Sequence, residues 1–118
     1  KVIIYAVNNN LDKINIDWKK EKSMTIVLCS KGYPGNYKKN ILIKGISKIK
    51  TTKNNMIFHA GTKFNDGKLL SSGGRVLNFT CIGNSFLTIR KKTIQLIKKL
   101  DWKNGFFRKD IGWKIIEK

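Results

Sequence analysis

Residues 58–83 read FHAGTKFNDGKLLSSGGRVLNFTCIG, and this stretch decides how the chain folds. Strand-forming runs at 56–64 and 68–71 flank Asn65-Asp66-Gly67, whose residue types tolerate the left-handed backbone of a tight turn. The pattern therefore predicts a β-hairpin.

A second break, Ser71-Ser72-Gly73-Gly74, delivers Arg75 to the start of another apolar strand, expected at 76–82. Glycines at such a point leave backbone N–H groups open to a ligand that approaches closely. A guanidinium beside free backbone donors is suited to holding a phosphate or a carboxylate. We therefore expect an anion-binding turn here.

The other main elements follow from apolar spacing. Residues 23–29, SMTIVLC, predict a central strand that is buried on both faces. Residues 85–100 carry apolar side chains three and four positions apart, which predicts one amphipathic helix capped by Asn84 or Ser85. Residues 41–49 indicate a short strand and a turn. We expect an α+β fold, with a mainly antiparallel, partly barrel-like sheet and this one main C-terminal helix packed on it.

Composition limits the classes of function. Of 118 residues, 25 are Lys or Arg and 7 are Asp or Glu, which gives a net charge of +18. Nucleic-acid binding would use such a charge, because neutralised phosphates supply most of the non-specific affinity. Only three of the basic residues are arginines, however, and the lysines are scattered instead of forming a block, as on a solvated surface. We favour one domain with a solvated basic surface.

The compartment is predicted from what the sequence lacks. No stretch approaches the roughly 20 apolar residues of a membrane span, and no signal-peptide pattern is present. Cys29 and Cys81 have no partner at metal-ligand spacing and are expected to be buried free thiols. These features predict a soluble, cytoplasmic protein. The start at Lys1 in place of a methionine indicates a fragment.

Some residues leave two interpretations open. His59 is the only histidine and is more simply a packed strand residue than a catalyst. Pro34, the only proline, makes a rigid turn that either reverses the chain or contacts a ligand. The closing stretch at 106–113, FFRKDIGW, is either a stacking platform for bases or an aromatic plug at the end of the sheet, and we favour the plug.

The motifs together resemble a known family. SKGYPGNY at 30–37, FHAGTK at 58–63 with SSGGRVLNFT at 71–80, and FFRKDIGW at 106–113 are similar in order and spacing to the C-terminal domain of phosphoribosylamine–glycine ligase, also called glycinamide ribonucleotide synthetase, an ATP-grasp family of purine biosynthesis. The resemblance implies a domain of the rudimentary single hybrid motif type at 23–118. It also implies that 1–22 is the end of a preceding helix and a connection to the ATP-grasp core.

The resemblance further implies a reaction. ATP, glycine and 5-phosphoribosylamine would give glycinamide ribonucleotide, ADP and phosphate through glycyl phosphate, with Mg²⁺ or Mn²⁺ neutralising the triphosphate. The family's metal motif, Arg-(Leu/Phe)-Gly-Asp-Pro-Glu, is absent, since Pro34 belongs to another loop. We therefore expect no catalytic or metal-binding residue here, and no ligase activity without the N-terminal and ATP-grasp domains of the same polypeptide.

Substrate contacts are carried over by position. Relatives hold the ribose 5-phosphate with a lysine after the corresponding strand and an arginine of a Gly-Arg turn, and Lys63 and Arg75 match these. The pocket wall is expected to comprise Gly32, Tyr33, Pro34, Gly35, Gly73 and Gly74. The alternative function is a small basic nucleic-acid-binding module that uses Arg108, Trp113 and the lysine-rich helix.

Overall fold

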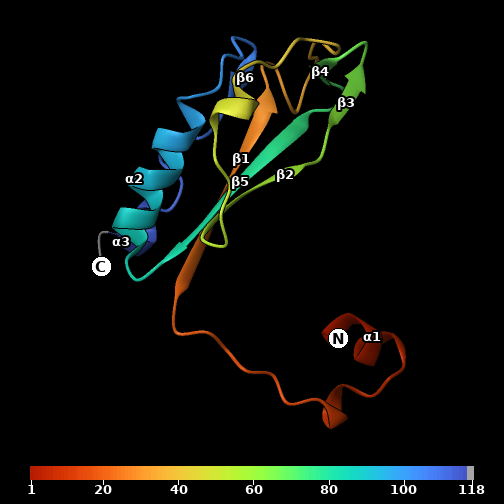
Figure 1. Cartoon of the computed structure of the whole chain (residues 1–118), viewed down its shortest axis with the longest axis vertical. Helices are drawn as coiled ribbons and strands as arrows, with labels where there is room; N and C mark the ends of the chain where they lie inside the picture. The colour runs from red at the N-terminus through yellow and green to blue at the C-terminus, as the bar shows by residue number, and fades with distance from the viewer. Residues whose placement is uncertain (117–118) are drawn as a thin grey trace.

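The sheet of this protein is built from strands whose side chains alternate between a buried and an open face. The computed structural model describes residues 1–116. A four-stranded antiparallel sheet has the order β2-β5-β1-β6, and β3 pairs with β4 in a separate two-stranded sheet (Figure 1). The elements are α1 (Val2–Val7), the 3₁₀ turn η1 (Leu11–Lys13), β1 (Lys22–Ser30), the 3₁₀ turn η2 (Ile46–Lys48), β2 (Asn55–His59), β3 (Thr62–Asn65), β4 (Lys68–Ser71), β5 (Arg75–Gly83), α2 (Phe86–Ile97), β6 (Gly105–Phe106) and α3 (Trp113–Ile116).

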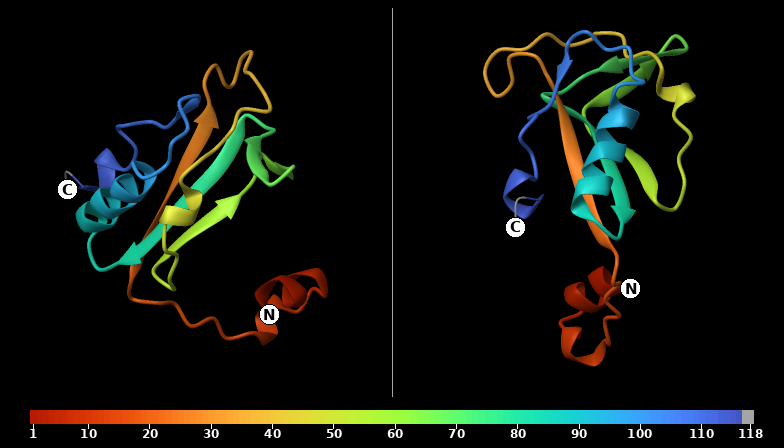
Figure 2. Two further views of the ribbon diagram at one scale, coloured as in Figure 1. Left: turned by 45° about the horizontal axis from the view of Figure 1, so that its top comes forward. Right: turned by 90° about the vertical axis from the view of Figure 1, so that its left-hand side faces the viewer.

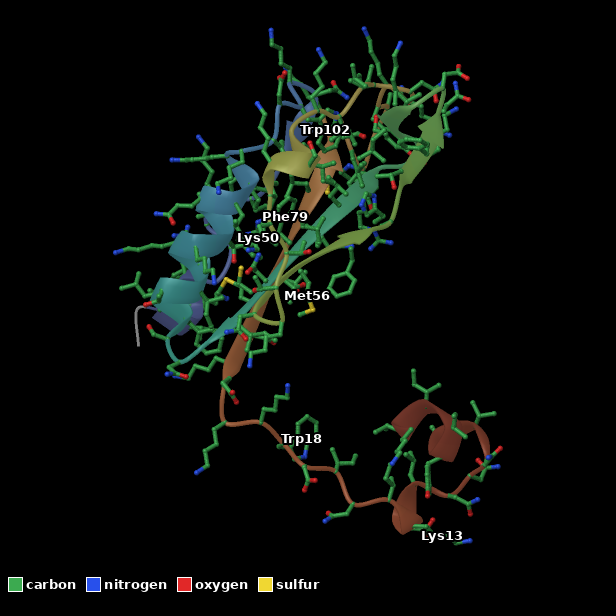
Figure 3. The ribbon with its side chains drawn as sticks, viewed as in Figure 1. Lys13, Trp18, Lys50, Met56, Phe79 and Trp102 are labelled. Atoms are coloured by element: carbon green, nitrogen blue, oxygen red, sulfur yellow. The ribbon has the colours of Figure 1, made fainter. Side chains whose placement is uncertain are left out.

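The core lies between the two central strands and helix α2. The helix runs along β1 and β5, as Figure 2 shows in its right-hand view. It buries Ile89, Thr93 and Ile97, which recur at spacings of four as the sequence predicted. Phe79 of β5, which has no exposed surface, points into this layer (Figure 3). The predicted helix at 85–100 and the predicted strand at 76–82 are therefore confirmed as α2 and β5.

The prediction for residues 23–29 is right about the strand and wrong about its burial. Strand β1 is central, since it pairs with β5 on one side and with β6 on the other. Its side chains alternate, however: Met24, Ile26 and Leu28 are buried under α2, while Thr25 and Val27 are exposed. Thr25 and Val27 are β-branched like buried strand residues, so composition alone concealed the alternation.

The partly barrel-like sheet is a second correction. Within residues 1–116 both sheets are open, because β2 and β6 are edges that do not meet. The run at 56–64 is not one strand of a hairpin; it divides at Ala60-Gly61 into β2, which pairs with β5, and β3, which pairs with β4. The turn at 65–67 was predicted correctly, and Asp66 and Gly67 have positive φ angles of 46° and 71°.

The strand expected at 41–49 is also wrong. Leu42 and Lys44 each make only a single bridge, to Leu70 and Asp101 respectively. The turn expected near Gly45 does occur. Gly45 has a φ of 81° and immediately precedes the 3₁₀ turn η2. This segment therefore links the β4 end of the molecule to the end of α2 without joining a sheet.

An N-terminal arm, residues 1–21, extends from the body on the side of the strands opposite α2 (Figure 1). Helix α1 has no buried residue, and Ile3, Val7 and Trp18 are 78%, 77% and 86% exposed. Trp18 stands apart from the sheet in Figure 3. No helix in the described part of the chain has both the length and the apolar character needed to cross a membrane.

Candidate functional site

Three of the sequence motifs meet at one end of the sheet. Ser30, the last residue of β1, donates its backbone amide to the Gly74 carbonyl (2.8 Å) and its hydroxyl to the Gly73 carbonyl (2.9 Å). The Gly61 carbonyl of the HAGTK motif accepts the amides of Ser72 (2.7 Å) and Gly73 (3.2 Å). The loops SKGYPG, HAGTK and SSGGR are thus held together by main-chain contacts.

Glycine is required at two of these contacts. A Cβ on Gly61 would lie 2.5 Å from the Arg75 carbonyl oxygen and 2.8 Å from the Gly73 Cα, so the two chains cross backbone to backbone. A Cβ on Gly74 would overlap the ring of Tyr33. These glycines therefore serve close packing. The amide of Gly73 is occupied by Gly61, which corrects the expectation that it is free for a ligand.

Arg75 faces the open side of the sheet because of a register shift. Leu28 pairs with Leu77, but the next residue, Cys29, pairs with Arg75, which leaves Val76 as an extra, fully buried residue in β5. Paired residues point to the same face, so Arg75 points outward with Cys29. Its side chain is exposed and, among residues 1–116, makes no ion pair or side-chain hydrogen bond.

An apolar cavity of about 200 Å³ lies beside Arg75. The outer face of β1 and the segment after β6 contribute most of its lining. Arg75 and Arg108 also line it. The whole set is Thr25, Ile26, Val27, Cys29, Arg75, Phe106, Phe107, Arg108 and Ile111. Burial raises the pKa of the Cys29 thiol, and the positive charge of Arg75 opposes that rise.

Lys63 lies on the separate hairpin. It is on β3, opposite Leu70 of β4, and its side chain is exposed. It is only two residues from Gly61, which touches the Arg75 backbone, yet it is not part of the lining of the Arg75 cavity. The HAGTK and SSGGR motifs therefore meet through their backbones, but Lys63 and Arg75 do not line one cavity. His59 bonds to the Thr62 hydroxyl through Nδ1 (3.0 Å).

The expected pocket wall is divided. Tyr33, which precedes Pro34 through a cis peptide bond, packs on Gly74 and meets Tyr37 edge to face, with ring centroids 6.1 Å apart. Gly32 takes a φ of 101°. Other residues of this loop border a different, open basin of about 530 Å³, which is lined by Lys31, Asn36, Tyr37, Lys38 and Asn104. The loop thus supports the Gly73-Gly74 turn but does not line the Arg75 cavity.

Sequence reasoning missed the contribution of the closing stretch to this cavity. Phe107 is half-buried against the core, as expected for an aromatic plug, whereas Phe106 is 39% exposed and lies beside Cys29 on the outer face. Arg108 is bonded to Asp110 through Nη2 (2.6 Å), which lowers the pKa of that carboxyl. A signal was available, since an arginine flanked by aromatics matches the composition of binding surfaces.

The described residues do not form a metal centre. Within 1–116 no group of three or more His, Cys, Asp or Glu side chains is placed to hold an ion. The nucleic-acid alternative also loses a residue, because Arg108 is bonded to Asp110 and is not a free cation. What the geometry of residues 1–116 offers is the guanidinium of Arg75, which has no ion pair among these residues, beside an apolar hollow at a junction of tightly packed loops.

Comparison with known proteins places this geometry in a family. The sequence profile described as "Phosphoribosylglycinamide synthetase, C domain" matches residues 23–114. The chain belongs to this family. The matched region of this C domain contains all the motifs described above, and the N-terminal arm lies outside it.

Relatives of the C domain support the same assignment. The chain is 38% identical over 113 residues to phosphoribosylamine–glycine ligase of Brucella melitensis, covering 96% of the chain and 26% of that protein. It is 44% identical over 115 residues to the ligase of Agrobacterium fabrum, covering 97% and 27%. A crystal structure of the ligase from Thermotoga maritima superposes with a TM-score of 0.70 at 26% identity, covering 92% of this chain and 27% of that one. The chain thus spans about a quarter of the length of these relatives.

Proposed function

We propose that the chain acts as the C-terminal, substrate-side part of a phosphoribosylamine–glycine ligase. The full-length enzyme would join glycine to 5-phosphoribosylamine with ATP, through glycyl phosphate, in purine biosynthesis. The observation that carries the proposal is the family match over residues 23–114, together with relatives of that name that are 38% and 44% identical. Because the chain spans about a quarter of their length, it would be inactive alone.

Within that enzyme, Arg75 would hold the 5-phosphate of phosphoribosylamine. A phosphate dianion needs fixed cations, and Arg75 is an exposed guanidinium that makes no ion pair with the rest of residues 1–116. The crossing at Gly61 and the packing at Gly74 hold the backbone that positions it. Lys63 would be a second phosphate ligand, reaching across from the hairpin, and the Gly32–Gly35 loop with Gly73 and Gly74 would form the neighbouring wall.

ATP and its Mg²⁺ or Mn²⁺ would bind elsewhere in the polypeptide. The chain has 7 acidic residues, and those of 1–116 gather into no metal-binding group, so the residues present do not fit the metal. No step of the reaction is therefore assigned to this chain beyond holding substrate. The N-terminal and ATP-grasp domains of the same polypeptide would provide the rest.

Residues 1–22 would be the connection to those domains, and 23–118 the substrate-side domain. The exposed apolar residues of α1 and Trp18 support this division, because they need a partner surface to be shielded from water. We also propose a cytoplasmic location, which is consistent with the unpaired thiols of Cys29 and Cys81.

Steady-state kinetics of the full-length ligase carrying Arg75→Ala tests the proposal. Losing a charge-assisted contact of about 1.5–3 kcal/mol should raise the KM for phosphoribosylamine by about 10- to 150-fold. Glycine-dependent acyl phosphate formation should persist, because that step does not use the phosphate of the amine substrate. An unchanged KM would remove Arg75 from the site, and a wild-type polypeptide without ligase activity would refute the function itself.

Lys63→Ala has a matched control in the same hairpin. Lys68 is also an exposed lysine and lies on β4, where it pairs with Asn65. If Lys63 contacts the phosphate, Lys63→Ala raises the KM for phosphoribosylamine and Lys68→Ala leaves it unchanged. Equal effects of the two substitutions would mean that Lys63 contributes only to the general positive field.

A further inference from the structure

One wall of the cavity beside Arg75 is formed by the closing stretch, residues 106–113. The residues that this stretch contributes to the lining are Phe106, Phe107, Arg108 and Ile111. Its first residue is fixed by the pairing of β6 with β1, and the right-hand view of Figure 2 shows the stretch running beside β1. After Phe106 no strand pairing holds it within the described chain, so another contact must set the position of Arg108 and Ile111.

Arg90 of α2 makes that contact. Its Nε donates a hydrogen bond to the carbonyl of Ile111 (2.9 Å), and its Nη2 donates one to the carbonyl of Lys109. The two acceptors are two residues apart, and the planar guanidinium reaches both at once, which a lysine ammonium cannot do with the same geometry. The backbone bond from the Ile111 amide to the Arg108 carbonyl (3.3 Å) only turns the stretch on itself. Arg90 therefore ties this wall to α2.

The acidic residue of the stretch is held by the same group of cations. Asp110 lies between the two acceptor residues, and its carboxylate accepts a 2.6 Å hydrogen bond from Arg108. Hydrogen bonding to Arg108 is the main cause of the lowered pKa of Asp110, and the positive charge of Arg90 adds to the lowering. The carboxylate is thus engaged within the stretch, and Arg75 has no ion pair among residues 1–116.

Arg90 differs from the lysines that follow it on α2. Ile89 and Thr93 point into the core, and Arg90 is partly buried at the edge of this stripe. Lys91 and Lys92 are exposed and make no ion pair within residues 1–116. Removing a positive charge from α2 therefore has a matched control in the neighbouring residue.

We infer that Arg90 is a positioning residue for the anion site: by binding the carbonyls of Lys109 and Ile111, it holds the cavity wall and so sets how tightly the site at Arg75 binds a phosphate. This inference deepens the proposed function and rests on it for the role of Arg75. Arg90 does not line the cavity itself, so its effect passes through the placement of the wall. A misplacement of about 1 Å in a binding site is enough to weaken it.

The test measures binding of ribose 5-phosphate, the phosphate-bearing part of the amine substrate, to the full-length polypeptide by calorimetry. Arg90→Ala removes both hydrogen bonds, and we expect the Kd for ribose 5-phosphate to rise about tenfold while the Kd for ATP is unchanged. Arg90→Lys keeps the charge without the fork and should restore only part of the affinity. Lys91→Ala removes one charge from the same helix and should bind like the wild type.

Hydrogen exchange of the same variants shows whether the wall has moved. The amides of Ile111 and Trp113, which donate to Arg108 and Asp110, should exchange about tenfold faster in Arg90→Ala than in Lys91→Ala. Faster exchange with unchanged binding of ribose 5-phosphate would overturn the inference, because Arg90 would then serve stability alone.

Three further outcomes are decisive. Unchanged exchange in Arg90→Ala would overturn the inference, and so would an equal loss of affinity for ATP and for ribose 5-phosphate. A wild type that binds no ribose 5-phosphate would overturn it as well, since there would be no anion site to position. A polypeptide that shows the expected binding pattern but has no ligase activity would refute only the proposed function.

Discussion

The crossing of the HAGTK and SSGGR motifs at Gly61 gives the sharpest prediction for this chain. In Gly61→Ala, the new Cβ would lie 2.5 Å from the Arg75 carbonyl oxygen and within 2.9 Å of the Gly73 Cα and amide nitrogen. These are backbone atoms, so the segments must move apart. Overpacking of this kind costs about 1–3 kcal/mol, and weakening the hydrogen bonds from Ser72 and Gly73 adds about 1 kcal/mol. The total is about 2–4 kcal/mol.

Amide hydrogen exchange measures this loss locally. In the full-length polypeptide, the amides of β5 should exchange about 30- to 900-fold faster in Gly61→Ala, since about 1.4 kcal/mol corresponds to a factor of ten. Gly67→Ala is the control: its Cβ would meet nothing within 4 Å, and only the φ of 71° is unfavourable, at about 1 kcal/mol. If Gly61→Ala exchanged no faster than Gly67→Ala, the two motifs would not be held by close packing.

Three other predictions concern the core, the cavity and the exposed ion pair. Phe79→Ala should destabilise the domain by about 3–5 kcal/mol, measured by denaturant unfolding, because Phe79 is wholly buried; a loss below about 1 kcal/mol would contradict the packing. Arg75→Leu should move the pH midpoint of Cys29 alkylation upward, since the guanidinium counteracts the burial that raises the thiol pKa; a downward or absent change would place Arg75 away from Cys29. Asp110 should titrate below the ordinary value for aspartate, about 3.9, in a carboxyl NMR titration, and Arg108→Gln should raise its pKa toward that value. The folded-state pKa of this carboxyl is lowered, so its contribution to stability is present at neutral pH and disappears as the pH falls through the lowered pKa.

Much of the local structure was predictable from the sequence, because it depends on short-range spacing. Helix α2 was recognised from apolar residues three and four apart, and Ile89, Thr93 and Ile97 form its buried stripe. The turn at Asn65-Asp66-Gly67 followed from residues that accept positive φ. Such features depend on residues only a few positions apart in the chain, so a single sequence is enough to identify them.

The errors arose where distant segments decide the outcome. The run at 56–64 divides at Ala60-Gly61, because its first part pairs with β5 and its second part with β4, and both partners lie outside the run. The cavity beside Arg75 was missed for the same reason, since Phe106 reaches Cys29 only when β6 returns to the edge of β1. Lys63 and Arg75 were expected to hold one phosphate together; they lie on different sheets, and their shared contact with a ligand stays a prediction.

The extra residue Val76 affects how the orientation of Arg75 is predicted from sequences of this family. Strict alternation from Leu77, Phe79 and Cys81 would aim Arg75 at the interior, and the shift opposite Leu28 and Cys29 turns it to the outside. A protein that kept all these residues but paired the strand without the register shift would turn its guanidinium into the hydrophobic layer. The register of the strand, as much as the identity of the arginine, determines whether the charge is available to a ligand.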